Sequence, residues 1–358
     1  MGNFIDKFRE IKSRRDELAP PINTDDDASP KLIKSRKWQV MDSTFQWKLS
    51  LVLCAALPLL ASMLTTVVVA SATEVAAKVP CLAAMADTTK NISDANNLDE
   101  TEAFFRREKE ARVPIIMYHL VTENSRYIGK YGISPADLRS DLQFLKDNNY
   151  NTVVIQDLIN FVEDGKALPP NPIVLTFDDG NASDYKFLLP LLKEYDMKAV
   201  VSIIGKTTNE MTSKQAENPT AVYPNLTWSQ VQELHNSGHI EVQSHGYDVH
   251  GRAGSGKLMR ESASTYHQRL KTDLQKLQDL CQQHLNYRPT TFCYPYGIIS
   301  KGSHAVLTEL GFAVSLSCQE GINTIVYGDA SCLLKLNRVN RASGRPVSAI
   351  LDALQKKK

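Results

Sequence analysis

The chain has 358 residues, enough for one large domain or two smaller ones. Its 41 basic and 40 acidic residues leave a net charge of +1, so we expect no nucleic-acid partner held by a basic surface. The six cysteines are irregularly spaced and predict neither a disulfide scaffold nor a zinc knuckle.

The N-terminal part of the chain predicts a single membrane anchor. Residues 1–48 are polar and mixed in charge, which is typical of a disordered tail. Residues 49–73 contain no charged side chain and could span a hydrocarbon core of about 30 Å as one helix. Basic residues precede this segment, so the positive-inside rule predicts a cytoplasmic N-terminus and an extracellular remainder. The alternative is a cleaved signal peptide, but the polar leader is long for one.

A stalk over residues 74–111 and a globular domain over residues 112–358 are expected to follow. In this domain strand and helix signals alternate, which predicts a mostly parallel sheet and suits one α/β barrel. Local signals support the helices: Ser134 and Thr227 are N-cap residues, and Gly165 is typical of a helix end.

Four apolar runs of the domain end abruptly in polar, reactive side chains, and each run is typical of a buried parallel strand. In α/β barrels the active site lies at the carboxyl ends of the strands. Gathered at one rim, these ends would supply two carboxylates, three imidazoles and a backbone turn, which is enough for a mononuclear metal hydrolase. The runs are residues 113–119, 173–179, 239–245 and 291–297.

The second run ends in Asp178 and Asp179, followed by Gly180. Adjacent strand side chains point to opposite faces, but a turn at Gly180 can bring both carboxylates near one centre. One carboxylate would then bind a metal while the other accepts a proton from water. The alternative is a structural turn or helix cap.

His245 and His250 follow the third run at a spacing of five. This spacing converges on neither a helix nor a strand, so a loop starting at Gly246 is needed. With Asp179, the two imidazoles would form a facial triad with open positions. The alternative is a pair of unrelated loop histidines.

His119 ends the first run and is our candidate general acid, since histidine has an ordinary pKa near neutrality. The alternative is a structural histidine. The fourth run closes in the turn Tyr294–Gly297, which can present a backbone N–H to an oxyanion, although by itself it predicts only a turn.

Three motifs resemble those of the polysaccharide deacetylases of carbohydrate esterase family 4; they are residues 176–180, 244–250 and 292–297. The resemblance implies a distorted (β/α)7 barrel that removes N-acetyl groups from amino-sugar polymers. It implies zinc, or else Co, Ni, Mn or Fe, as the metal. The implied roles are Asp178 as catalytic base, Asp179, His245 and His250 as metal ligands, and the Tyr294 N–H as oxyanion donor.

The sequence departs from the family pattern in two places. Cys293-Tyr-Pro replaces the Arg-Pro-Pro whose arginine steadies the base, and Arg338 or Arg341 is expected to take over. The late Leu-x-His motif is absent after residue 304. Residues 117–119 resemble a circularly permuted branch, the exopolysaccharide poly-N-acetylglucosamine deacetylases, and this implies that His119 is the acid.

The expected protein is therefore a membrane-anchored, extracellular deacetylase of a polymer such as peptidoglycan or poly-N-acetylglucosamine. Two alternatives stay open: a carbohydrate-binding pseudoenzyme, and a metal-dependent amidase acting on a non-sugar amide. Bound metal together with acetate release would separate the first alternative from an active enzyme.

Overall fold

The computed structural model describes residues 109–218, 220 and 224–356. The predicted tail, the predicted membrane segment (49–73) and most of the predicted stalk lie outside these residues. Among the described helices, none combines the length and apolarity needed to cross a membrane.

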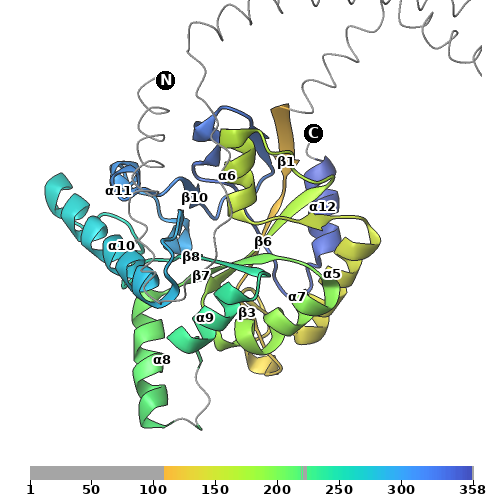
Figure 1. Ribbon diagram of the computed structural model, residues 1–358, viewed down its shortest axis with the longest axis horizontal. Helices are drawn as coiled ribbons and strands as arrows, with labels where there is room; N and C mark the ends of the chain where they lie inside the picture. Colours follow the sequence, from red (N-terminus) through yellow and green to blue (C-terminus); the bar gives the residue numbers. More distant parts are fainter. Residues whose placement is uncertain (1–108, 219, 221–223, 357–358) are drawn as a thin grey trace, which may run out of the picture. The chain divides into compact units, whose positions relative to one another are not determined.

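A curled sheet of parallel strands forms the centre of the domain (Figure 1). Its order is β10-β9-β8-β7-β6-β2-β12, and β5 pairs with the start of β6. A further parallel bridge joins Leu316 of β10 to Leu336, just before β12, so the two ends of the sheet approach each other. This curvature is consistent with the predicted (β/α)7 barrel. The strands are β2 (Ile115–Tyr118), β5 (Asn151–Thr152), β6 (Pro172–Asp179), β7 (Ala199–Ile203), β8 (Ile240–Ser244), β9 (Thr291–Cys293), β10 (Val314–Leu316) and β12 (Val339–Asn340).

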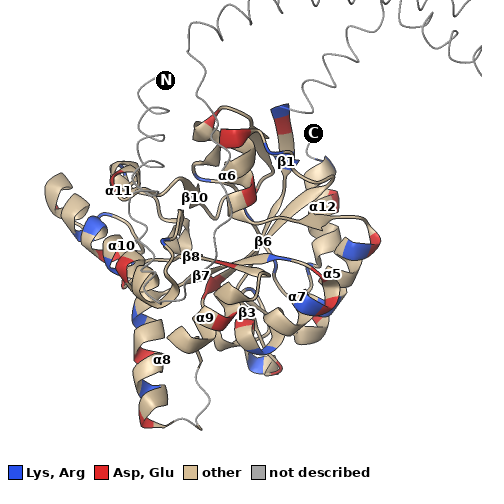
Figure 2. Ribbon diagram, viewed as in Figure 1, with Lys and Arg blue, Asp and Glu red and all other residues tan. Residues whose placement is uncertain are grey.

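Helices surround the sheet, and Figure 2 shows that many of the charged residues lie on them. The predicted N-caps are confirmed: the Ser134 and Thr227 side chains each accept from the backbone N–H three residues on. The predicted helix end is also confirmed, because Gly165 adopts φ 68°. The helices are α5 (Pro135–Asp147), α6 (Ile155–Asp164), α7 (Leu189–Tyr195), α8 (Gly205–Glu217), α9 (Trp228–Asn236), α10 (Ala263–Leu285), α11 (Ser303–Glu309) and α12 (Val347–Lys356).

The remaining elements are short. Strand β1 (Glu110–Val113) pairs antiparallel with β11 (Asn323–Val326), and β3 (Leu120–Val121) pairs with β4 (Gly132–Ile133). Within the described part of the chain, one π-helical segment, η3 (Asp184–Leu188), leads into α7, and the 3-10 turns are η2 (Ser125–Tyr127), η4 (Pro295–Gly297) and η5 (Ala330–Leu333).

Strand β6 shows how the sequence places a reactive side chain inside the barrel. Ile173, Leu175 and Phe177 belong to the cluster that packs against the surrounding helices, whereas Val174 belongs to a second cluster with residues of β2, β7 and β10. Because side chains alternate along a strand, Asp178 continues the face of Val174 and Thr176. The alternation therefore directs Asp178 toward the inner side of the sheet.

Candidate metal centre and active site

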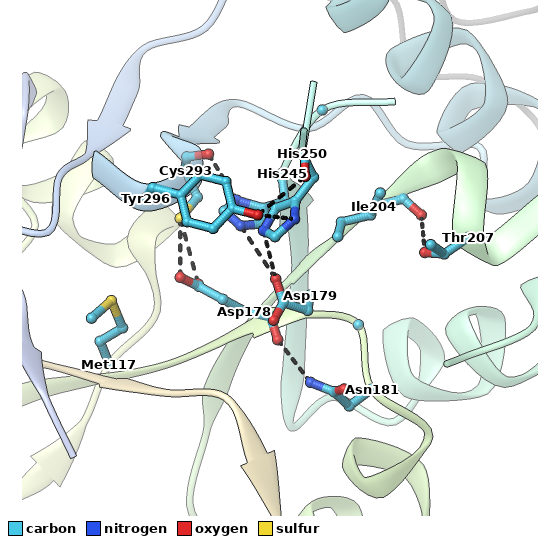
Figure 3. Close-up of polar contacts among 12 residues, drawn as sticks. Met117, Asp178, Asp179, Asn181, Ile204, Thr207, His245, His250, Cys293 and Tyr296 are labelled. Carbon is cyan, nitrogen blue, oxygen red and sulfur yellow. Dashed lines mark hydrogen bonds and ion pairs between the residues drawn. The ribbon is translucent and has the colours of Figure 1, made fainter. Parts of the chain in front are cut away.

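Strand β6 delivers Asp178 and Asp179 to the rim, as predicted. Asp179 and Gly180 both adopt positive φ, 78° and 63°. A left-handed backbone is unusual for aspartate and turns the chain sharply after the strand. The predicted turn therefore begins one residue before the glycine, and it directs the Asp179 carboxylate toward the histidines (Figure 3).

Asp179, His245 and His250 meet at one point, as the sequence predicted. Oδ1 of Asp179 lies 3.5 Å from Nε2 of His245 and 3.1 Å from Nε2 of His250. His245 extends β8 and is anchored by its backbone N–H, which donates to the Ile203 carbonyl. The three ligand atoms all lie within 4.8 Å of one another. One cation can thus contact all three.

The contacts on the far side of each imidazole suit a metal. Nδ1 of His245 lies 2.8 Å from the Cys293 carbonyl, which only accepts, so this nitrogen carries the proton. Nδ1 of His250 lies 3.2 Å from the Tyr296 hydroxyl, whose own proton goes to the His250 carbonyl. Both Nε2 atoms are then free to ligate, and such outer contacts commonly orient metal-binding histidines.

Asp179 gives an independent test of this fit. Its buried Oδ1 has no hydrogen-bond partner of normal geometry, although it faces two imidazoles. An ionised, unsatisfied oxygen facing two nitrogen lone pairs is the donor set expected of a Zn²⁺ or related site.

A second trio, Asp178, His245 and Cys293, also brings ligand atoms within the same range. It suits a cation poorly, because the Arg338 guanidinium already neutralises Asp178. The first trio is therefore the candidate metal site.

Asp178 is held by Arg338 from the far end of the domain. The guanidinium donates through Nη1 to Oδ1 at 2.8 Å and through Nη2 to Oδ2 at 2.9 Å. Burial acts to raise the pKa of Asp178, but the Arg338 charge lowers it to about 2. Of the two arginines expected to reach this carboxylate, Arg338 therefore does so, whereas Arg341 pairs with Asp141 at 2.7 Å.

Cys293 also contacts Asp178, the predicted base. Its Sγ lies 3.4 Å and 3.5 Å from the two Asp178 oxygens. A thiol is only a weak donor, so the strong support of Asp178 comes from Arg338.

His119 lies on the same rim, directly after β2. Its buried Nδ1 has no hydrogen-bond partner. Burial lowers the pKa of His119, while the charges of Asp178 and Asp179 act in the opposite direction. The two aspartate charges act on His119 because its imidazole lies near them.

The structure corrects the predicted role of Tyr294. Its backbone N–H donates to the Leu316 carbonyl at 3.1 Å, and its buried hydroxyl contacts Ser303. The amide is therefore occupied by the ladder between β9 and β10 and is not available to an oxyanion.

Two tyrosines at the site escaped the sequence analysis. The ring of Tyr296 lies 4.7 Å from that of His250, and the ring of Tyr131 lies 4.8 Å from that of His119. Both are exposed, at 56% and 51%. Tyr296 has φ 57° in the turn η4, so its position inside the Tyr294–Gly297 motif was a signal for it. Nothing in the sequence around Tyr131 indicated its place.

Comparison with known proteins agrees with this geometry. The family model "Polysaccharide deacetylase" matches residues 165–315, which include both aspartates and both histidines of the centre. His119 and Arg338 lie outside the matched segment.

Relatives carry related names. A poly-beta-1,6-N-acetyl-D-glucosamine N-deacetylase of Escherichia coli strain K12 is 25% identical over 58% of this chain, and the chain spans 34% of that protein's length. The putative polysaccharide deacetylase YxkH of Bacillus subtilis is 25% identical over 70% of this chain and 79% of its own length.

Among solved structures, a de-N-acetylase from Aggregatibacter actinomycetemcomitans superposes with a TM-score of 0.57 and 27% identity. The alignment covers 68% of this chain and 99% of that one. The barrel, the aspartate–histidine centre and the matching family model agree: the chain carries a polysaccharide deacetylase domain.

Proposed function

We propose that this protein is a metal-dependent N-deacetylase that hydrolyses the N-acetyl groups of an N-acetylglucosamine polymer. The observation that carries the proposal is the convergence of Asp179, His245 and His250 beside a base, Asp178, that is already paired with Arg338. The names of the relatives support the amino-sugar polymer as substrate.

Asp179, His245 and His250 would hold the cation, and zinc fits their donor set best. When bound, the cation would polarise the acetyl carbonyl and lower the pKa of water.

The chain's own residues supply the proton transfers. Asp178 is ionised at neutral pH and accepts the proton of the attacking water, while Arg338 fixes the direction of its carboxylate. His119, on the same rim, protonates the departing amine nitrogen, and its lowered pKa makes the protonated form a strong acid. Acetate and a glucosamine amine are released.

The oxyanion donor is reassigned within this proposal from Tyr294 to Tyr296. Tyr296 is the residue of the turn η4 whose ring and hydroxyl contact His250, and we propose its backbone N–H in that turn as the donor. A preorganised backbone N–H at this place would stabilise the developing negative charge.

A membrane tether and an extracellular domain belong to the same proposal. They are supported by the uncharged segment 49–73 and by the basic residues before it. Labelling of the intact protein in cells by a membrane-impermeant reagent tests this part.

Acetate release tests the activity. The full-length chain with zinc should release acetate from poly-β-1,6-N-acetylglucosamine oligomers, and peptidoglycan and β-1,4-linked oligomers should be compared in parallel. Asp178→Asn should be inactive, whereas the exposed Glu320→Gln should retain activity. Stoichiometric zinc binding without acetate from any polymer would identify a pseudoenzyme instead.

A further inference from the structure

The loop between the two histidine ligands is short and has no regular structure to place His250. Gly246, at φ 84°, begins it, and Val249 anchors its end in a cluster with Leu270 and Leu274 of α10. The position of the second ligand therefore depends on what holds Tyr247 and Asp248 between these points.

The carbonyl side of this loop is held by the start of α8. The Gly205 N–H donates to the Gly246 carbonyl at 3.1 Å, and the Lys206 N–H donates to the Tyr247 carbonyl at 2.9 Å. These bonds use main-chain groups only, so no single side chain controls them.

The amide side is held by one carboxylate, Asp273 of α10. Its Oδ1 accepts from the Tyr247 N–H at 2.8 Å, and its Oδ2 accepts from the Asp248 N–H at 2.7 Å. Hydrogen bonds to an ionised acceptor are about twice as strong as those between neutral groups. Asp273 is half-buried, so water competes only in part.

Close packing makes this arrangement specific. A Cβ at Gly246 would lie 3.1 Å from Oδ1 of Asp273 and 2.3 Å from Cγ2 of Val249, so the loop passes directly against the carboxylate. The Lys276 ammonium lies 3.7 Å from the centre of the Tyr247 ring, which adds a second contact from the same helix.

We infer that Asp273 is a positioning residue that sets the metal affinity of the centre by fixing the loop between His245 and His250. The inference rests on the proposed metal site. Without this carboxylate the loop becomes ordered only when the metal binds. The conformational entropy lost in ordering it then weakens metal binding. Loss of an outer contact to a ligand typically weakens metal binding by about 10- to 100-fold.

Metal affinity, measured without substrate, tests the inference. Zinc dissociation constants of the full-length wild type, Asp273→Ala and Asp273→Asn would be obtained by competition with a chromophoric chelator. Alanine removes both acceptors, and a weakening of about 10- to 100-fold is expected. Asparagine keeps the shape but places an NH₂ group against one of the two N–H donors, so an intermediate weakening is expected. Asp279→Asn is the matched control, since Asp279 lies on the same helix and pairs only with Arg288 among the described contacts.

These measurements separate failure of the inference about Asp273 from failure of the proposed metal site. If the wild type binds no zinc, the metal centre itself is refuted. If the wild type binds zinc and both Asp273 variants bind it equally tightly, the inference alone is overturned. Thermal unfolding of the metal-free proteins completes the test: a lower unfolding temperature with an unchanged dissociation constant would assign Asp273 a purely structural role.

Discussion

The Arg338 guanidinium binds both oxygens of Asp178, and the two residues stand 160 positions apart in the sequence. Nη1 also donates to the Thr176 hydroxyl, and Nε donates to the Ser317 carbonyl, so the guanidinium is fixed on several sides. Because both side chains are almost fully buried, the pair can neither rearrange nor be replaced by water. The proposed base is thus preorganised by a residue that follows almost the whole barrel in sequence.

Replacement of Arg338 by methionine should strongly destabilise the fold. It leaves the Asp178 carboxylate buried without a partner, and breaking such a pair typically costs about 3–5 kcal/mol. Urea unfolding at pH 7 measures the loss. Arg345→Met removes the exposed pair with Glu320 and should cost no more than about 1 kcal/mol. Equal losses in the two variants would contradict the role of Arg338.

Arg338 also determines how stability depends on pH. The folded-state pKa of Asp178 is about 2, below the ordinary 3.8, so the unfolded chain binds more protons between these values. The stabilisation is fully present above pH 3.8 and is lost as the pH falls through about 2. Its size is on the order of 2 kcal/mol, at about 1.4 kcal/mol for each unit of pKa. Asp178→Asn lacks this titration. The difference in unfolding free energy between the wild type and Asp178→Asn should therefore become smaller as the pH falls from 4 to 2.

Replacement of His119 by glutamine should reduce kcat by about 10²- to 10⁴-fold, the usual contribution of a general acid. Since burial lowers the pKa of His119, the wild-type kcat/KM should fall as the pH rises through a value below the ordinary 6.5. This alkaline decline should be absent in His119→Gln. Zinc affinity should stay within a few-fold, because His119 is outside the metal trio. A variant that keeps the decline would assign the acid role to another group.

Metal binding should stabilise the wild type and not His250→Ala. A ligand that binds only the folded state adds about 2.7 kcal/mol at a free concentration of 100 Kd. The midpoint of thermal unfolding, with and without zinc at that concentration, measures the effect. Chelator should return the wild type to its metal-free midpoint. An equal shift in His250→Ala would place the cation elsewhere.

Local sequence motifs were enough to predict most residues of the site. The caps at Ser134 and Thr227, the helix end at Gly165 and the ends of β6 and β8 depend on neighbouring residues, and all were predicted correctly. The meeting of Asp179 with His245 and His250 followed from the rule that parallel strands present their carboxyl ends at one rim. These features need only periodicity, capping chemistry and strand direction.

What required the tertiary structure were contacts between residues remote in the sequence. Arg338 and Arg341 flank β12 three positions apart, so their side chains point to opposite faces, and the pairing of β12 with β2 decides which of them meets Asp178. The Tyr294 amide proved to be occupied because β10 pairs with β9, a register that the turn motif does not encode. Asp273 reaches the histidine loop only because α10 packs beside it. A sequence specifies local conformation through neighbouring residues, whereas such partners are selected by packing of the whole domain.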